Sequence, residues 1–149
     1  MGETRAEMGQ AAVEVAALAR PEAWSAEGST GPAMIAHVVL FRPKPHLTAD
    51  ARRRLVDGFT RAIREIPQIR RARIGRRVTH GRPYEQLMRA DYSYAAVLEF
   101  DDVDGLKGYL AHHAHEALGA AFFECFEDTL IYDYEMGEPA TLLPLLGGD

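Results

Sequence analysis

Residues 34–41 read MIAHVVLF, a run of apolar and β-branched side chains that stops at Arg42 and Pro43. This composition favours a β-strand, and proline ends it because proline has no backbone N–H to donate to a neighbouring strand. Side chains alternate between the two faces of a strand, so the larger ones share one face and the smaller ones share the other. The first set is Ile35, His37, Val39 and Phe41, and the second is Ala36, Val38 and Leu40. Both faces are mainly apolar, so both require a cover.

The same two-sided pattern recurs at residues 92–100, which read YSYAAVLEF. One face of this second strand carries Tyr94, Ala96, Leu98 and Phe100, and the other carries Ala95, Val97 and Glu99. Strands that are apolar on both faces belong in the middle of a sheet, where other elements cover them. The two runs therefore predict the two central strands.

The segments around these strands alternate between helical and extended patterns. Thr48 has the side chain of an N-cap, and apolar residues recur at helical spacing from Ala51 until Pro67 ends the pattern. Residues 70–78, RRARIGRRV, alternate as an exposed edge strand does. Helical spacing returns over residues 106–126, and we expect an interruption near the histidines. Residues 129–136 are predicted to form the last strand. The order β-α-β-β-α-β predicts an α+β, ferredoxin-like fold with both helices on one face of the sheet.

One sheet face is then left without helices, and its side chains are apolar. These are Ala36, Val38, Leu40, Ala95 and Val97. Leaving several hundred Å² of apolar surface wet forfeits roughly several kcal/mol, comparable with the net stability of a domain. A second copy packed sheet to sheet would cover this patch, so we expect a homodimer that closes an α/β barrel. Recognition of RNA on this face is disfavoured, because no aromatic side chains stand where bases would stack.

The length and composition fit one domain. The chain has 149 residues, 47% of them hydrophobic, and we expect a domain over 34–136 between an extension at 1–33 and a tail at 137–149. Met34 stands directly before the first strand, so the protein is expected to start either there or at Met1. A single cysteine, Cys125, excludes an internal disulfide, and no apolar run reaches the roughly 20 residues of a membrane span. These features predict a soluble, cytoplasmic protein.

Charge is unevenly distributed along the chain. Residues 52–89 hold twelve arginines against Asp57, Glu65 and Glu85, a local charge of +9 within a chain of net charge -5. Such a segment is either a solvated face or a surface for an anion, a nucleic acid or an acidic partner. Without interleaved aromatic residues, the nucleic-acid interpretation is the weaker one.

Five segments resemble, in order and spacing, the stress-responsive dimeric α/β barrel (Dabb) family. They are HVVLF, REIPQIRRARIG, YAAVLEF, GYLAHHAHEAL and LIYDYE, within residues 34–136. The resemblance implies a ferredoxin-like fold that dimerises through its sheets. One branch of the family comprises polyketide cyclases, which fold and deprotonate a linear polyketide with a Tyr and His acid–base pair.

The resemblance also implies roles for individual residues. His115 corresponds to the catalytic histidine, His37 to a pocket histidine and Tyr109 to a pocket tyrosine. Two positions depart from the cyclase pattern, since Tyr94 stands in place of a histidine and Phe59 in place of a tyrosine. A cyclase-like site here would need a rearranged hydrogen-bond network.

The strand and helix patterns point His37 and His115 into the layer between helices and sheet. An imidazole there, with a pKa near 6.5, can take a proton from carbon next to a carbonyl, while Tyr94 and Tyr109 donate to the developing oxygen charge. The alternative is that the two histidines only satisfy each other or a backbone carbonyl. His112 and His113 are expected to face solvent, and no set of convergent ligands predicts a metal or other cofactor.

The expected function is binding of a small apolar or polyketide-like molecule, and a further expectation is that the protein converts this molecule by acid–base chemistry. The alternative is a structural stress protein with a filled interior.

Overall fold

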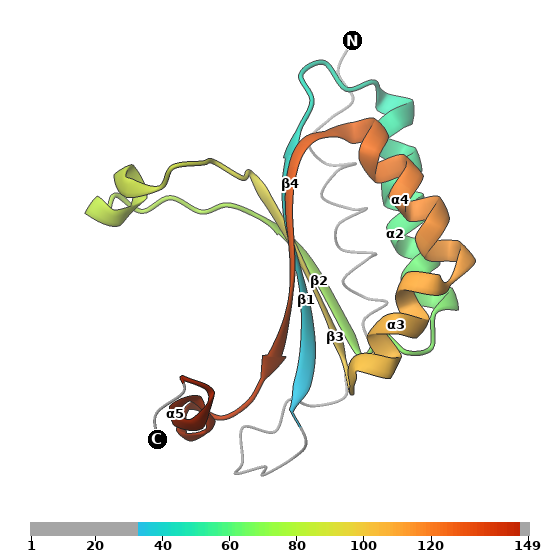
Figure 1. Ribbon diagram of the computed structural model, residues 1–149. Coiled ribbons are helices and arrows are strands. Elements are labelled where there is room, and N and C mark those ends of the chain that lie inside the picture. The colour runs from blue at the N-terminus through green and yellow to red at the C-terminus, as the bar shows by residue number, and fades with distance from the viewer. Residues whose placement is uncertain (1–32, 147–149) are drawn as a thin grey trace.

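The computed structural model describes residues 33–146, which form one antiparallel four-stranded sheet covered by helices on one side (Figure 1). The strand order is β2-β3-β1-β4, with β1 (Met34–Pro43) and β3 (Tyr94–Phe100) in the centre and β2 (Arg71–Arg76) and β4 (Phe126–Met136) at the edges. The ferredoxin-like fold and the central position of the first and third strands are thereby confirmed.

Three helices lie on the same face of the sheet: α2 (Ala49–Glu65), α3 (Val103–Ala111) and α4 (His113–Cys125) (Figure 1). Helix α2 begins at Thr48, whose hydroxyl accepts the N–H of Ala51 at 3.1 Å, and it ends at Ile66 before Pro67. Helix α3 begins where Asp102 accepts the N–H of Gly105 at 2.7 Å. Side-chain acceptors of this kind satisfy backbone donors that have no partner inside the helix.

The predicted interruption of the second helical stretch occurs at His112. The chain bends there, because His112 takes an extended conformation with ψ 140° and serves both as the C-cap of α3 and as the N-cap of α4. Its Nδ1 accepts the N–H of Ala114 at 3.0 Å. One histidine therefore separates two helices that the hydrophobic pattern alone would join.

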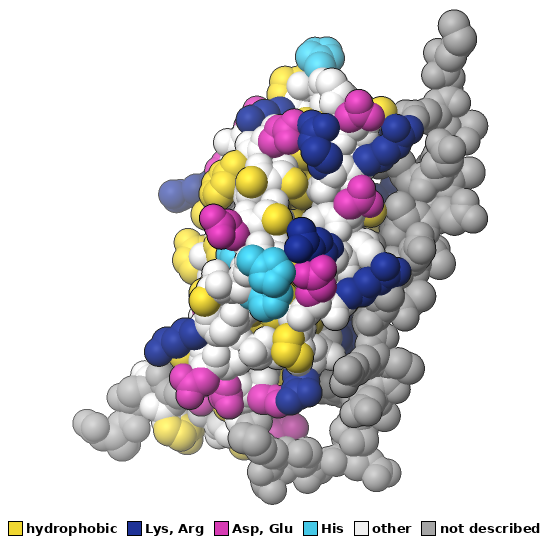
Figure 2. Space-filling view, turned by 90° about the vertical axis from the view of Figure 1, so that its right-hand side faces the viewer, with side chains coloured by type: hydrophobic (Ala, Val, Ile, Leu, Met, Phe, Trp, Pro, Cys, Tyr) yellow, Lys and Arg dark blue, Asp and Glu magenta, His cyan; other side chains and the backbone are white. Residues whose placement is uncertain are grey.

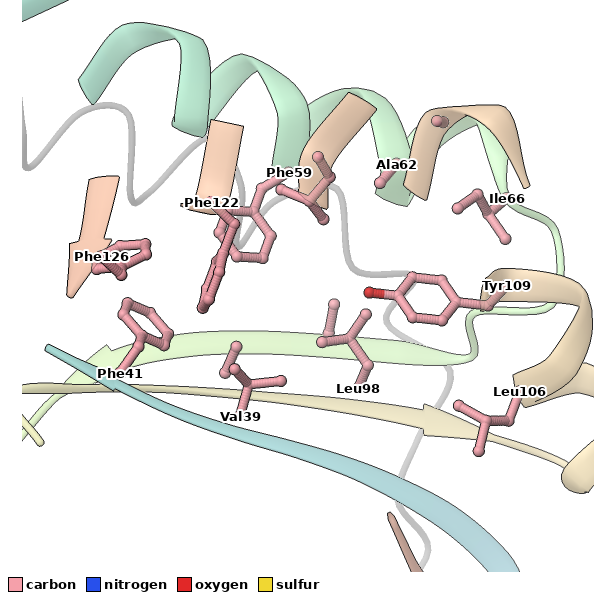
Figure 3. Close-up of a cluster of buried hydrophobic side chains, with 14 of the residues drawn as sticks. Val39, Phe41, Phe59, Ala62, Ile66, Leu98, Leu106, Tyr109, Phe122 and Phe126 are labelled. Atoms are coloured by element: carbon pink, nitrogen blue, oxygen red, sulfur yellow. The ribbon is translucent and has the colours of Figure 1, made fainter. Parts of the chain in front are cut away.

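The core lies between the helices and the face of the sheet with larger side chains. Phe41 sits against Phe126 and Phe122, with ring centroids 4.4 and 5.3 Å away, at one end of this layer (Figure 3). Leu98, Phe100 and Ile66 are almost fully buried nearer the other end. The alternation predicted for both central strands is confirmed by this burial pattern.

The opposite face of the sheet carries no helix of the described chain (Figure 1). Ala36 is buried there, and Val38, Leu40, Ala95 and Val97 are half-buried. The register adds three β4 side chains that the sequence interpretation did not include: Leu130, Tyr132 and Tyr134, opposite Leu40, Val38 and Ala36. The sheet remains open, so one chain alone does not make a barrel.

Three further short elements lie outside the layers. The connection from β2 to β3 contains the 3-10 helix η1 (Pro83–Leu87), and β4 is followed by η2 (Pro139–Thr141) and α5 (Leu142–Leu145). The predicted extension at 1–33 lies outside the described residues, apart from its last position. Within the described range, no helix is long and apolar enough to cross a lipid bilayer.

Candidate functional site

His37 and Asp133 form the polar centre of the helix-covered layer. The register of β1 and β4 places these residues opposite each other, with both side chains on the helix side. His37 is 5% exposed, and its Nδ1 lies 2.6 Å from Oδ1 of Asp133. An ionised carboxylate only accepts, so the Nδ1 atom that faces it carries a proton.

Tyr109 of α3 joins the two histidines. Its ring meets His37 edge to face at a centroid distance of 5.5 Å and His115 at 4.5 Å. The hydroxyl points into the layer between helices and sheet (Figure 3). Burial, and then the negative charge of Asp133, raise the pKa of Tyr109 far above its ordinary value. The phenol therefore stays neutral and can donate a hydrogen bond.

His115 lies in the first turn of α4 and is half-buried. Burial is the main cause that lowers its pKa, the neighbouring charge of His37 lowers it further, and a hydrogen bond with the backbone of Leu110 opposes both. A lowered pKa keeps the imidazole neutral near pH 7, so it can accept a proton. A neutral histidine beside a neutral tyrosine has the protonation states that an acid–base pair would require.

The structure brings together three of the predicted site residues and separates the other two from them. The ring of Tyr94 stacks on that of Phe41 at a centroid distance of 5.7 Å. Tyr94 lies four residues along β3 from Leu98, which is the strand partner of His37. At about 3.3 Å per residue, that separation is about 13 Å. Phe59 shares the apolar core with Tyr109 but is not among the rings that contact it, which are those of His37, Phe100 and His115. Thus His37, Tyr109 and His115 form the cluster, and Tyr94 and Phe59 do not.

Asp133 was missed by the sequence interpretation, although strand alternation contained the signal. It shares a face of β4 with Thr129 and Ile131, and a carboxylate on the helix side of a strand needs a partner. The central strand supplies His37. Sequence alone did not fix the register that sets these two residues opposite each other.

Two surface hollows lie away from this cluster. One, of about 390 Å³, lies between α2 and α4 and is lined by Arg54, Gly58, Ala121 and Glu124 among others. The second, of about 280 Å³, lies at the end of β2 and β3 and includes Tyr94. A ligand pocket at His37, Tyr109 and His115 therefore stays a prediction.

His113 and His80 make local contacts. Nε2 of His113 lies 3.2 Å from Oε2 of Glu65 on the surface, and His80 lies 2.7 Å from the hydroxyl of Tyr84 within the β2–β3 connection. No group of three or more His, Cys, Asp or Glu side chains in the described part of the chain could hold a metal ion. Cys125 lies fully buried in the core, and its thiol contacts the carbonyl oxygen of Ala51 at 3.4 Å.

Several arginines of the arginine-rich segment pair with carboxylates. Arg61 pairs with Glu65 at 2.9 Å, Arg70 with Asp101 at 2.6 Å and Arg77 with Asp91 at 2.6 Å, and Arg54 pairs with Glu124 across α2 and α4. Figure 2 shows the two signs of charge intermixed over the helix-covered face. This arrangement is typical of a solvated surface more than of an anion-binding one.

Comparison with known proteins places these features in context. The family model described as the stress responsive A/B barrel domain (Dabb) matches residues 35–136. Olivetolic acid cyclase from Cannabis sativa is 22% identical over 100 residues, covering 67% of this chain and 94% of the cyclase. A dimeric ferredoxin-like protein from Thermobifida fusca matches with a TM-score of 0.56 at 22% identity, covering 74% of this chain and 96% of that one. Hydroxynitrile lyase from Passiflora edulis matches with a TM-score of 0.60 at 18% identity, covering 72% and 96%.

Proposed function

The chain belongs to the stress responsive A/B barrel domain family, and we propose that it binds a small apolar or polyketide-like molecule beside His37, Tyr109 and His115 and converts it by acid–base chemistry. The observation that carries this proposal is the continuous contact of the three rings, anchored by Asp133 at 2.6 Å from His37. A distant relative named as a cyclase and a structural neighbour named as a lyase support it.

The proposed step begins with proton abstraction. An imidazole nitrogen of neutral His115 takes a proton from a carbon of the bound molecule that lies next to a carbonyl group. The electron pair of the broken C–H bond then forms an enolate. Tyr109 donates a hydrogen bond to the enolate oxygen, which stabilises the charge that develops there. In a ring closure, the enolate carbon bonds to a second carbonyl carbon, and the resulting alkoxide takes back the proton from His115. Atoms and charge balance without a cofactor.

We further propose that the working molecule is a homodimer. Ala36, Val38, Leu40, Ala95 and Val97 would form the interface, joined by Tyr132 and Tyr134, which are 52% and 49% exposed in the single chain. Structural neighbours from Thermobifida fusca and Bacteroides fragilis are described as dimeric. Packing two such faces together covers the apolar surface that one chain leaves wet.

The acid–base proposal is tested by His115→Ala, with His113→Ala as the matched control. Both histidines lie in the first turn of α4, but His113 is on the surface beside Glu65. We expect His115→Ala to lower turnover of a linear polyketide analogue by about 10²-fold or more, and His113→Ala to leave it unchanged. Turnover is followed by mass spectrometry of the cyclised product. Equal rates for wild type and His115→Ala would contradict the proposal.

A non-catalytic structural role is the second candidate, and the packing of the cluster favours it. His37 and Tyr109 are 5% and 2% exposed, and the two surface hollows lie elsewhere. In that case no small molecule would co-purify with the protein, and His115→Ala would change only its unfolding temperature. A mass-spectrometric survey of co-purified molecules separates the two roles.

A further inference from the structure

We propose that His112 is a positioning residue, which holds Tyr109 against His115 while its imidazole is neutral and stops capping α4 when the ring gains a proton. The consequence for turnover rests on the proposed function, because Tyr109 and His115 are the proposed acid–base pair. The contact that carries the inference is a helix cap, and this cap can be observed without a substrate.

The backbone of His112 joins the two members of the pair directly. Its N–H donates to the carbonyl oxygen of Tyr109 at 3.1 Å, and its own carbonyl oxygen accepts the N–H of His115 at 3.0 Å. Residue 112 takes an extended conformation between the end of α3 and the start of α4 (Figure 1). The rings of Tyr109 and His115 meet across this junction at a centroid distance of 4.5 Å. Their mutual placement therefore depends on the conformation of residue 112.

The side chain of His112 fixes the start of α4. Its Nδ1 accepts the N–H of Ala114 at 3.0 Å, where a hydroxyl or carboxylate oxygen is the more usual acceptor. A ring nitrogen accepts a hydrogen bond only while it carries no proton, and a protonated imidazole donates at both nitrogens. Protonation of Nδ1 and this cap therefore exclude each other. Histidine is the side-chain type that changes charge between about pH 5 and 8, so this cap responds to pH as a serine or asparagine cap would not.

The charged groups of α2 and α4 around this ring give a proton on it no carboxylate partner. The ring of His113 stacks on that of His112 at a centroid distance of 4.3 Å, and Glu116 lies in the same first turn of α4. On α2, Glu65 pairs with His113 at 3.2 Å and with Arg61 at 2.9 Å. Within residues 33–146, no carboxylate pairs with His112 itself. Two stacked imidazoles that both carry a proton repel each other.

The end of α3 offers the protonated ring a different partner. The last carbonyl groups of a helix have no partner within it and carry partial negative charge, whereas the first turn carries partial positive charge. A cationic His112 is therefore disfavoured at the start of α4 and favoured at the end of α3. The charged side chains of α3 are Asp104 and Lys107, and both are exposed. We expect the ring to turn from α4 to α3 on protonation, so the first turn of α4, which holds His115, loses its cap.

Nuclear magnetic resonance tests the cap without a substrate. As the pH falls from about 8 to 5, the amide proton of Ala114 should lose its acceptor. Its resonance should then move upfield along the same titration curve as the ring of His112. His112→Asn supplies an acceptor that gains no proton, so in this variant the Ala114 resonance should move far less. His113→Asn makes the same change one residue further along and should keep the wild-type movement. An Ala114 resonance that ignores the ring of His112, or that moves equally in His112→Asn, would overturn the inference.

Turnover measures the consequence for the proposed acid–base pair. Between about pH 7.5 and 5.5, wild type should lose roughly threefold to tenfold more of its rate with the linear polyketide analogue than His112→Asn loses. His113→Asn should lose as much as wild type. Equal losses in wild type and His112→Asn would overturn the positioning role. A protein without turnover at any pH, whose Ala114 resonance still follows His112, would support the cap and overturn the proposed chemistry.

Discussion

At the scale of single residues, the histidines of residues 109–118 divide by position and not by type. His112 caps a helix, His113 meets Glu65 on the surface, and His115 enters the layer beside Tyr109. Helical periodicity predicted that His115 points inward and that His112 and His113 face solvent. His113 is exposed, whereas His112 is half-buried, as His115 is. The chemical difference among these identical side chains therefore comes from their places in the chain. His112 lies between α3 and α4, whereas His113 and His115 lie on different sides of the first turn of α4.

The lowered pKa of His115 predicts a pH-dependent contribution to stability. The unfolded histidine, with its pKa near 6.5, binds a proton more readily than the folded one. The free energy of unfolding should therefore fall as the pH drops through about 6.5, and it should be unaffected by this group above that value. His115→Gln removes this part of the slope. Urea unfolding between about pH 7.5 and 5.5 measures it, and parallel curves for the variant and wild type would contradict the assignment.

Asp133 provides a second prediction at this scale. Asp133→Ala removes the acceptor at 2.6 Å from His37 and should lower the free energy of unfolding by about 1 kcal/mol, a value reduced because the carboxylate is 43% exposed. Asp57→Ala, which removes an exposed carboxylate on α2, is the control and should cost less than about 0.5 kcal/mol. Chemical denaturation at neutral pH gives both values. An equal loss of unfolding free energy in the two variants would mean that the hydrogen bond between His37 and Asp133 does not stabilise the protein.

At the scale of elements, capping explains which boundaries could be predicted. Thr48 and Asp102 are ordinary N-caps, and Thr48 was predicted from the sequence together with the proline that ends α2. Histidine at an N-cap is less usual, so the sequence predicted an interruption near residues 112–115 but not the residue that makes it. The pairing of β4 with β1 depends on tertiary register, and for that reason Asp133 and Tyr132 were not placed from sequence.

The cap at His112 can be tested directly. His112→Ala leaves the N–H of Ala114 without its acceptor and should lower the free energy of unfolding by about 1 kcal/mol, whereas His112→Ser keeps an acceptor and should cost less. The comparison of the two variants in urea separates capping from loss of the ring. If serine were as costly as alanine, the contact between the rings of His112 and His113 would explain the effect in its place.

At the scale of the whole molecule, the central strands are apolar on both faces, and one chain supplies a cover for only one of them. The helices cover the face that holds Val39 and Leu98, while Val38 and Val97, directly paired across β1 and β3, remain half-buried on the other. Sequence could indicate that a cover is missing, because alternation fixes the face of each residue. It could not indicate the orientation of that cover, because alternation fixes only the face on which each side chain lies.

The proposed dimer is most sensitive at Val38, which pairs with Val97 on one side and Tyr132 on the other at the centre of the open face. Val38→Asp would place an unpaired charge in a desolvated interface and should raise the dimer Kd by about 10²-fold or more. The separated chain should keep its fold, since in the single chain this side chain faces away from the helix-covered core. Val103→Asp, at a position of 48% exposure on α3, introduces the same charge away from the open face and should leave the dimer intact. Sedimentation velocity with circular dichroism distinguishes dissociation from unfolding. A Val38→Asp protein that stays dimeric would show that the open face is not the interface.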